Sequence, residues 1–246
     1  MKYIVTGCSN GIGRCICLTL LKNNHEVYGI DIDKKGKDLE DINEKFHFYR
    51  VDIGDKKELD LFLKNVEYIR FDGIINNAGF NSEGLDSCSY DEFNYALKVG
   101  LSAPFYLVKS LRYNLNKDAS IVNIASTRAL MSQKNNESYA TVKGGILALT
   151  HAMAMTLRNK ARVNSISPGW IDVSNYNESK KIEISNNDML QHPVGRVGKP
   201  EDIAEMVLFM CSDKGSFING ENIVIDGGMS KQMIYHNDDY WKYKGE

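Results

Sequence analysis

Seven short apolar or β-branched segments recur along the chain and alternate with longer segments of helical pattern. The predicted strands are KYIVTG (2–7), EVYGID (26–31), HFYRVD (47–52), GIINNAG (73–79), ASIVNIAS (119–126), ARVNSISPG (161–169) and ENIVIDGG (221–228). The predicted crossover helices include GRCICLTLLKNN (13–24), KKELDLFLKNV (56–66) and YDEFNYALKVGLSAPFYLVKSL (90–111). Such alternation is typical of a parallel sheet with right-handed crossovers and helices on both faces. The sequence therefore predicts an α/β, doubly wound fold around a seven-stranded parallel sheet.

The chain is expected to form a single domain over residues 1–246. Its 246 residues are 43% apolar, enough for one sizeable core, and no repeat, low-complexity tract or linker marks a boundary. Segment 172–192, DVSNYNESKKIEISNNDMLQH, is the one long polar stretch of weak periodicity. Inside a compact domain such a stretch is more often a functional lid than a disordered loop. We therefore expect a polar substrate lid around 172–192, with a surface loop as the alternative.

Charge and cysteine content exclude several classes of function. Lys+Arg at 30 against Asp+Glu at 32 give a net charge of −2 without long runs of either sign, so we expect no nucleic-acid partner. The five cysteines form no C-x-x-C pair and no Cys/His cluster, so we expect no metal and reduced thiols. The sequence shows neither a signal-peptide pattern nor an apolar run of about 18 residues. This predicts a cytoplasmic protein with no membrane partner.

The segment TGCSNGIG follows the first predicted strand and leads into a helical pattern near Arg14. Its glycines, Gly7, Gly11 and Gly13, permit a tight turn and a close approach of backbone N–H groups to a pyrophosphate, which the helix N-terminus also attracts. The spacing is G-x-x-x-G-x-G rather than the G-x-G-x-x-G of the commonest dinucleotide fingerprint. In its strand–turn–helix context, the segment predicts a dinucleotide site in a Rossmann-type domain.

The second predicted strand ends at Asp31, 18 residues after Gly13. An acidic side chain there can accept hydrogen bonds from the adenosine ribose hydroxyls and repels the extra phosphate of NADP. Asn10 and Ile32 offer no cation to that phosphate, which agrees with this choice. We therefore expect NAD as the cofactor. The alternative is that Asp31 only begins a polar loop, with Asp33 close behind.

Tyr139 and Lys143 stand four residues apart in the segment YATVK, within a predicted helix. Side chains at this spacing are neighbours on one helix face, so the lysine ammonium can favour the ionised form of the tyrosine. Both residue types are common, and the pair alone is weak evidence of chemistry.

Several segments together resemble the short-chain dehydrogenase/reductase family, and the resemblance covers nearly the whole chain. TGCSNGIG resembles the family's cofactor loop, Asp52-Ile53 its adenine contact, and NNAG (76–79) the segment that closes its fourth strand. Ser126, Tyr139 and Lys143 match its catalytic spacing of 13 and then four residues. SPGWIDV (167–173) is similar to the nicotinamide-side turn. GRVGKPEDIAEMVLFMCSD (195–213) and INGENIVIDGG (218–228) are similar to the C-terminal half.

The resemblance implies an oxidoreductase in which Tyr139 is the acid/base and Ser126 hydrogen-bonds the substrate oxygen. Lys143 and an oxidised nicotinamide ring are expected to lower the pKa of Tyr139 from about 10 by roughly 2 to 3 units. The residues expected to contact the cofactor are Gly7, Ser9, Asn10, Gly11, Ile12, Gly13, Asp31, Ile32, Asp52, Ile53, Asn77, Ala78, Gly79, Val99, Tyr139, Lys143, Pro168, Gly169 and Ile171.

The chain departs from the family pattern at two positions. Gly100 stands where the family usually has an asparagine whose backbone carbonyl holds a water near the lysine. Glycine can retain a main-chain contact, so neutral drift is one explanation and lost activity the other. Val173 stands where a threonine often lies near the nicotinamide carboxamide, and Ser174 is a candidate to supply the hydroxyl instead.

The leading hypothesis is therefore an NAD-dependent oxidoreductase acting on a small-molecule secondary alcohol or its ketone. One alternative is a non-catalytic dinucleotide-binding sensor or scaffold, which Gly100 alone supports. Another is a carrier-linked ketoacyl reductase, which generally uses NADPH and docks an acidic carrier on basic surface. Asp31 and the net charge of −2 disfavour it.

Substrate and assembly follow less directly from the sequence. Arg128, Gln133 and Asn135, between the catalytic serine and tyrosine, suggest a hydroxylated or acidic substrate, although solvated loop residues are an equal alternative. Helices 91–111 and 138–158 carry more apolar residues than one sheet face needs, and the family commonly pairs these helices. We expect a homotetramer or homodimer with two-fold interfaces. The apolar residues behind this expectation are Phe93, Leu97, Leu101, Phe105, Leu149, Met153 and Leu157.

Overall fold

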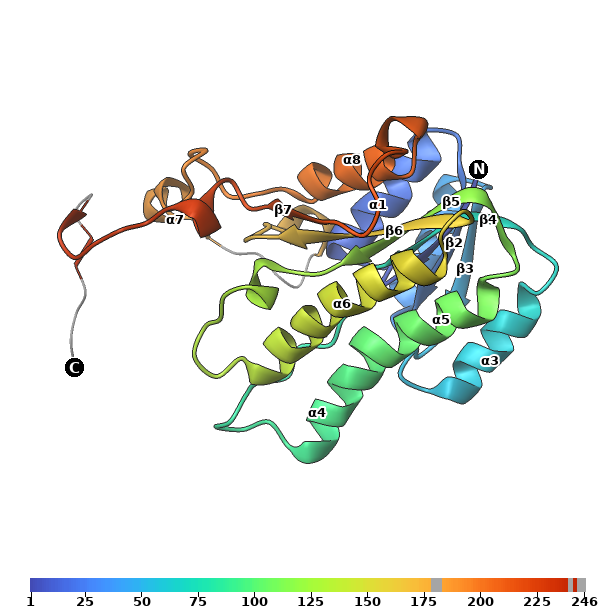
Figure 1. Ribbon diagram of the computed structural model, residues 1–246, viewed down its shortest axis with the longest axis horizontal. Coiled ribbons are helices and arrows are strands. Elements are labelled where there is room, and N and C mark those ends of the chain that lie inside the picture. The colour runs from blue at the N-terminus through green and yellow to red at the C-terminus, as the bar shows by residue number, and fades with distance from the viewer. Residues whose placement is uncertain (178–182, 239–240, 243–246) are drawn as a thin grey trace.

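The computed structural model describes residues 1–177, 183–238 and 241–242, and its strands form one sheet in the order β3-β2-β1-β4-β5-β6-β7 (Figure 1). Every neighbouring pair of strands runs parallel. The strands are β1 (Lys2–Thr6), β2 (Glu26–Asp31), β3 (Phe46–Arg50), β4 (Phe71–Asn76), β5 (Leu115–Ile124), β6 (Ala161–Pro168) and β7 (Asn222–Ile225). The prediction of a doubly wound α/β fold with a seven-stranded parallel sheet is confirmed.

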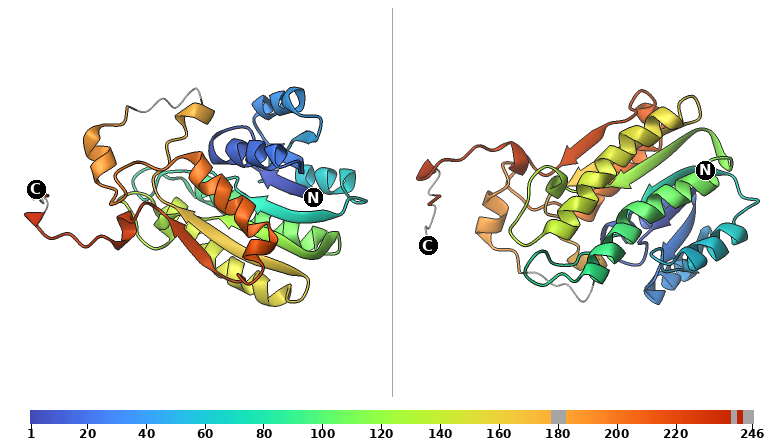
Figure 2. Two further views of the ribbon diagram at one scale, coloured as in Figure 1. Left: turned by 90° about the horizontal axis from the view of Figure 1, so that it is seen from above. Right: turned by 60° about the horizontal axis from the view of Figure 1, so that its bottom comes forward.

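Helices cover both faces of this sheet, as expected when every strand is followed by a right-handed crossover. On one face, α1 (Gly11–Lys22) packs against α8 (Pro200–Met210). The opposite face carries α3 (Lys56–Asn65), α5 (Ala103–Leu111) and α6 (Glu137–Thr156), and Figure 2 shows both layers from two further directions. The shorter helices are α2 (Asp38–Ile42), α4 (Tyr90–Leu97) and α7 (Asn186–Leu190).

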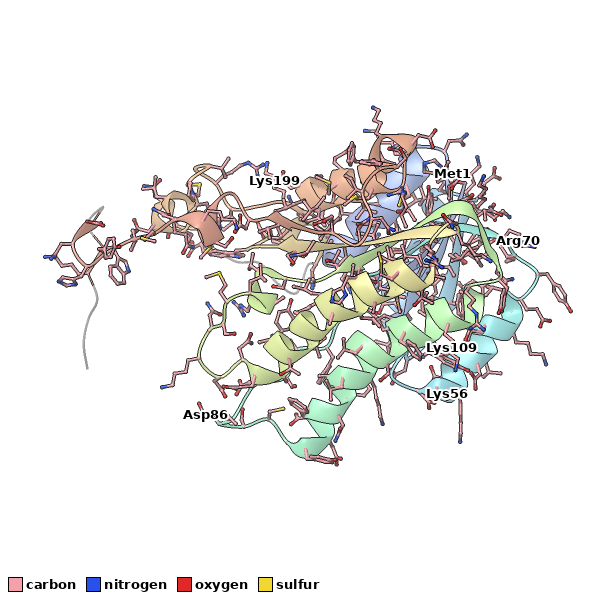
Figure 3. All side chains as sticks on the ribbon, in the orientation of Figure 1. Met1, Lys56, Arg70, Asp86, Lys109 and Lys199 are labelled. Carbon is pink, nitrogen blue, oxygen red and sulfur yellow. The ribbon has the colours of Figure 1, made fainter. Side chains whose placement is uncertain are left out.

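Each helix layer buries an apolar stripe against the sheet, which gives two cores. Leu20 of α1 and Val207 of α8 belong to one core, and Phe62 of α3 and Leu107 of α5 belong to the other. Burial of a side chain of this size contributes about 1.5 to 3 kcal/mol. The outer side of the α3 and α5 layer is charged, as the exposed Lys56 and Lys109 show (Figure 3).

Two of the apolar residues on which the expected subunit interface was based lie in the core instead. Met153 and Leu157 are 7% and 6% exposed and pack against the sheet. Phe105 of α5 is 48% exposed and Met155 of α6 is 63% exposed. The helical period of 3.6 residues places Met153 and Met155 on different faces of α6. The choice of Met153 and Leu157 in the predicted helix 138–158 as interface residues was therefore wrong. The homotetramer or homodimer itself stays a prediction.

The order of the strands places the ligand crevice. The chain winds outward from β1 to β2 and β3 and then returns to pair β4 with the other side of β1. The helices that follow β1 and β4 therefore lie on opposite faces, and a crevice opens at the carboxyl ends of these two strands. Thr6, Asp31 and Asn76 end their strands at this edge, which is where the sequence places the expected site residues.

A π-helical turn, Lys98–Ser102, joins α4 to α5 and contains Gly100. A side chain on Gly100 would overlap Val142 of α6, because a Cβ there falls far inside the van der Waals distance of the Val142 Cγ1 methyl group. π-turns inside α-helices are often found at functional sites. In this structure, a residue larger than glycine therefore fits at position 100 only if Val142 moves.

The polar insertion 172–192 contains a short 3₁₀ helix, Ser174–Tyr176, and α7. Part of the expected lid, 178–182, lies outside the described residues, so the lid stays a prediction. After a last 3₁₀ turn, Met229–Lys231, the described residues of the C-terminal segment run outward from the body (Figure 1). In the described part of the chain, no helix combines the length and apolarity required to cross a membrane.

The contact between Gly100 and Val142 can be tested by paired substitution. Glycine to alanine inside a helix ordinarily stabilises by about 0.5 to 1 kcal/mol. Here the new methyl group meets Val142, so Gly100→Ala should lower the free energy of unfolding by about 1 to 3 kcal/mol. The double variant Gly100→Ala, Val142→Ala should lose less free energy of unfolding than the two single variants together, by about 0.5 to 3 kcal/mol. Urea denaturation of the four proteins measures this coupling, and additive losses would contradict the packing explanation.

Candidate active site

The glycine turn after β1 allows its two ends to touch. Gly7 has a φ of +70°, in the left-handed region that glycine adopts without strain. A Cβ on Gly13 would overlap the Gly7 carbonyl oxygen, so α1 approaches the turn more closely than any other residue type permits. The turn is thereby compact enough for a phosphate group to reach backbone N–H groups.

The first turn of α1 presents backbone donors toward the crevice. The side chain of its N-cap, Asn10, makes no capping hydrogen bond, and its amide donates to the Asp33 carboxylate at 2.9 Å instead. Helix N-termini carry unpaired N–H groups and a partial positive charge. This turn therefore suits the pyrophosphate of a dinucleotide.

Asp31, at the end of β2, is held rigidly by the backbone. One carboxylate oxygen accepts a hydrogen bond from the Ser9 N–H and the other from the Asp33 N–H, both at 2.9 Å. Each oxygen keeps a second lone pair for a ribose hydroxyl. Arg50 ends β3 directly opposite Asp31 in the sheet, and its Nε donates to the Ile32 carbonyl at 3.1 Å. The sequence-based argument found no cation near Ile32 and missed Arg50, because the register of β2 and β3 is needed to bring it there.

Asp52, the expected adenine contact, is also fixed in orientation. Its Oδ1 accepts hydrogen bonds from the Gly54 N–H at 2.8 Å and from the Tyr95 hydroxyl at 2.9 Å. Burial, and then the contact with Asp52, raises the pKa of Tyr95 to about 12, so its hydroxyl stays a donor at neutral pH. Tyr95 was not predicted, since it lies on α4, far from Asp52 in the sequence.

Two cavities adjoin along the crevice. The smaller, of about 330 Å³, is lined by Gly7, Asp31, Ile32, Asp52, Ile53, Asn77, Ala78, Gly79 and Val99, together with Ile30, Val51, Phe80 and Tyr95. The larger, of about 770 Å³, is lined by Ile12, Asn77, Gly79, Ser126, Tyr139, Lys143, Pro168, Gly169 and Ile171 among other residues. Ser9, Asn10, Gly11 and Gly13 lie in the glycine turn.

Asn77 and Gly79 line both cavities and mark the boundary between them. The Asn77 amide donates to the carbonyls of Thr6 and Gly7 at 3.0 and 3.1 Å, and its N–H donates to the Thr6 hydroxyl at 3.0 Å. The ends of β1 and β4 are thus tied together at the middle of the crevice. Two adjoining cavities beside a phosphate-binding turn fit the two halves of a dinucleotide.

Ser126 and Tyr139 meet in the larger cavity. Ser126 caps the 3₁₀ helix Thr127–Ala129, where its hydroxyl accepts the Arg128 N–H at 3.2 Å. Its side chain lies close enough to the Tyr139 hydroxyl to affect the pKa of that group. Burial raises the pKa of Tyr139 above its usual value, while the contact with Ser126 and the charge of Arg128 act in the opposite direction. Among the chain's own groups, burial therefore sets the net direction of the Tyr139 pKa. The expected lowering includes the charge of an oxidised nicotinamide ring and stays a prediction.

Lys143 lies beside the Tyr139 ring and is held by the end of β5. Its ammonium lies 5.4 Å from the centroid of the Tyr139 ring and donates to the Ile124 carbonyl at 2.7 Å, so it faces the ring and the end of β5. The residue is 6% exposed, and burial lowers the pKa of Lys143 to about 8. Spacing on a helix brought the two side chains together as predicted, but it did not give the direction of the ammonium.

Comparison with known proteins identifies the family. The profile of a family described as Enoyl-(Acyl carrier protein) reductase matches residues 7–230. An uncharacterized oxidoreductase from Thermotoga maritima is 36% identical over 247 aligned residues, which cover 94% of this chain and 96% of the relative. The chain belongs to the short-chain dehydrogenase/reductase family. It is therefore a member of an oxidoreductase family.

Other members of the family cover the same length of chain. A 3-oxoacyl-[acyl-carrier-protein] reductase from Chlamydia pneumoniae is 32% identical, over 93% of this chain and 96% of its own. An apo SCOR enzyme from Clostridium thermocellum superposes with a TM-score of 0.87 at 43% identity, covering 99% and 98% of the two chains. A 4-hydroxyisoleucine dehydrogenase complexed with NADH gives a TM-score of 0.81 at 26% identity, covering 94% of this chain and 99% of its own.

Two secondary expectations for this family member change with the structure. Val173 lines the larger cavity, whereas Ser174, the suggested source of a hydroxyl, begins the adjacent 3₁₀ helix, where its N–H donates to Asp172. Arg128 and Gln133 line the cavity, but Asn135 accepts hydrogen bonds from the N–H groups of the 84–86 loop. Gln191 of the expected lid and Trp170 of the nicotinamide-side turn also line the cavity. The lining residues that sequence reasoning did not single out include Asn81, Ile124, Ala125, Thr127, Met131, Ser132, Asp226, Met229 and Ser230.

Burial of Lys143 predicts a pH-dependent stability. Its pKa is about 8 in the folded protein and about 10.5 in the unfolded chain, so between these values only the unfolded chain holds the proton. Rising pH then favours the folded state, by roughly 3 kcal/mol over the whole window. Lys143→Met removes this contribution. Denaturation at pH 7.5 and pH 10 should show the parent gaining stability relative to the variant.

Lys134→Met is the matched control, because Lys134 is exposed. Its difference from the parent should stay constant over the same pH range. If the difference in free energy of unfolding between the parent and Lys143→Met were also the same at pH 7.5 and pH 10, this would contradict the burial of the Lys143 ammonium.

Proposed function

We propose that the protein is an NAD-dependent oxidoreductase that transfers a hydride between the nicotinamide and a secondary alcohol or its ketone. The observation that carries this proposal is the convergence of Ser126, Tyr139 and Lys143 on one cavity that adjoins the dinucleotide cavity at Asn77. A protein that only bound the dinucleotide would not need all three side chains at the far end of its site.

Each of the three side chains takes one role in this proposal. Bound NADH supplies the hydride. Tyr139 gives its phenolic proton to the carbonyl oxygen as the alcohol forms and takes it back in the reverse direction. Ser126 hydrogen-bonds the same oxygen and orients it toward Tyr139. Because burial raises the pKa of Tyr139, the phenol is protonated at neutral pH and ready to act as the acid in reduction.

Lys143 acts chiefly as a positioning group in this proposal. Its ammonium lies near Gly79, a residue that also lines the smaller cavity, and it is fixed by the Ile124 carbonyl. There it can hydrogen-bond a ribose hydroxyl of the cofactor. Oxidation of an alcohol requires the phenolate, and the positive charge of an oxidised nicotinamide is the group proposed to lower the Tyr139 pKa for that direction.

The choice of NAD rests on the fixed carboxylate of Asp31. The Ser9 and Asp33 N–H groups hold it at the end of β2, where it would meet the adenosine ribose. The 2′-phosphate of NADP would carry about two further negative charges toward this carboxylate. Arg50 opposes this effect, since its guanidinium lies close to Ile32.

A carrier-linked reductase is the second candidate, because a relative of that activity is 32% identical over most of the chain. It differs from the main proposal in requiring a substrate attached to a carrier protein. Assays that offer the same oxoacyl group free and carrier-linked distinguish the two. Turnover only with the carrier would replace the main proposal.

Cofactor selectivity gives the first test. The parent protein should bind NADH at least about tenfold more tightly than NADPH, a difference of about 1.4 kcal/mol. Asp31→Ala should narrow the gap. The double variant Asp31→Ala, Arg50→Gln should then lose more affinity for NADPH than for NADH, relative to Asp31→Ala alone. Fluorescence titration of the three proteins with both cofactors measures the six affinities. Equal affinities in the parent protein would remove the basis for NAD.

Loss of the phenol gives the second test. Tyr139→Phe should lower turnover by about 10² to 10⁴, the usual contribution of a general acid, with little change in NADH affinity. Tyr106→Phe is the matched control, since the Tyr106 hydroxyl donates to Asp60 on the outer surface. Steady-state assays over a panel of ketones, with NADH titration in parallel, supply both readouts. A Tyr139→Phe protein that keeps a third of parental turnover would favour the sensor alternative.

A further inference from the structure

Among the residues that the structure describes, Arg128 lacks the carboxylate partner that two other arginines of the protein have. Arg14 and Arg196 each form a two-bond fork with a carboxylate, on Asp38 at 2.8 and 2.9 Å and on Asp202 at 2.7 and 2.8 Å. Arg128 is half-buried in the wall of the larger cavity, and its NH1 donates only to the neutral Asn136 side chain at 3.3 Å. Within residues 1–177, 183–238 and 241–242, no carboxylate lies at ion-pair distance from it.

The other charged residues that line this cavity are already engaged. Lys143 donates to the Ile124 carbonyl. Asp226 accepts hydrogen bonds from the N–H groups of Gly228 at 2.9 Å and Ser230 at 2.7 Å. Among the described residues that line this cavity, Arg128 is therefore the cation whose Nε and NH2 donors make no hydrogen bond to the protein. A guanidinium matches a carboxylate in charge and geometry better than any neutral group.

Arg128 also lies close to the proposed reaction centre. Its backbone N–H donates to the Ser126 hydroxyl, and its side chain contacts Asn136, the residue that precedes α6 one turn before Tyr139. Arg128, Ser126 and Tyr139 line the same cavity, and the charge of Arg128 acts on the Tyr139 phenol, so an anion on this guanidinium and a carbonyl at Ser126 and Tyr139 would share that cavity. Gln133 and Ser132 line the same part of the loop and offer neutral donors beside it.

We propose that Arg128 binds the carboxylate of the substrate, and that the substrates of this site are short oxo acids and the corresponding hydroxy acids. The inference rests on the proposed function, since it assigns the substrate class of the same site. In the reductive direction, the carbonyl carbon gains the hydride and its oxygen gains the Tyr139 proton. The carboxylate held by Arg128 is unchanged, and NADH becomes NAD⁺.

Arg128 has one competing role, as an electrostatic partner that only tunes Tyr139. The two roles predict different kinetics. A carboxylate-binding residue affects KM for acids far more than for neutral ketones, whereas a tuning residue affects kcat and its pH profile equally for both. Arg128→Lys separates them further, because it keeps the charge near Tyr139 but loses the planar fork.

The test uses matched pairs that differ only in the charge of one group. Pyruvate, acetoacetate and levulinate place the carboxylate at three distances from the carbonyl, and pyruvamide, acetoacetamide and levulinamide are their neutral counterparts. For at least one pair, the parent enzyme with NADH should prefer the acid in kcat/KM by about 10- to 100-fold, the size of one charge-assisted hydrogen bond. Arg128→Gln should remove most of this preference through KM. Lys134→Gln, which removes an exposed charge from the same loop, should retain it.

Binding provides a readout that does not depend on turnover. Calorimetric titration of the protein–NADH complex with butyrate and butyramide should show binding of the anion that Arg128→Gln abolishes. Anion binding that depends on Arg128 without turnover of any pair would support the anion site and contradict the proposed function. Turnover of acids and amides at similar kcat/KM would overturn the anion site and leave the proposed function standing. If Arg128→Gln lowered kcat/KM equally for the acid and the amide of each pair, Arg128 would act only on the electrostatics of Tyr139, and the proposed carboxylate binding would be wrong.

Discussion

The hydrogen bonds between Asn77 and the end of β1 hold the crevice together. The residues after β4 are fixed against Thr6 and Gly7 by three donors. These are the side-chain amide of Asn77, the backbone N–H of Asn77 and the backbone N–H of Ala78. This is the point at which the strand order reverses, so it joins the half of the fold that would hold adenosine to the half that holds Ser126 and Tyr139. The distance between the two cavities is set here, and with it the place that a dinucleotide can reach.

Much of this arrangement could be predicted from the sequence because it depends on residues that end strands. In a parallel sheet every strand ends at the same edge, so Asp31, Asn77 and Ser126 could be assigned to one crevice before their contacts were known. The glycine turn was equally accessible, since a strand, a turn and a helix follow one another in the sequence. Contacts between neighbours in the chain, or one helical turn apart, were predicted correctly.

What could not be predicted depends on register, direction or packing between distant elements. Arg50 reaches Ile32 only through the pairing of β2 with β3. Lys143 is adjacent to Tyr139 on the helix, yet its ammonium is held by the Ile124 carbonyl, and burial sets the direction of the Tyr139 pKa. A composition-based count of apolar residues likewise cannot distinguish Met153 in the core from Met155 at the surface. Each of these depends on a neighbour that is distant in the sequence.

The contact of Gly100 with Val142 has a consequence for how this protein can evolve. A side chain at position 100 and the β-branched side chain at position 142 compete for one volume between α6 and the π-helical turn. An asparagine at position 100 therefore requires a smaller residue at 142 or a displacement of α6. The residue that is tolerated at one of these positions thus depends on the residue present at the other.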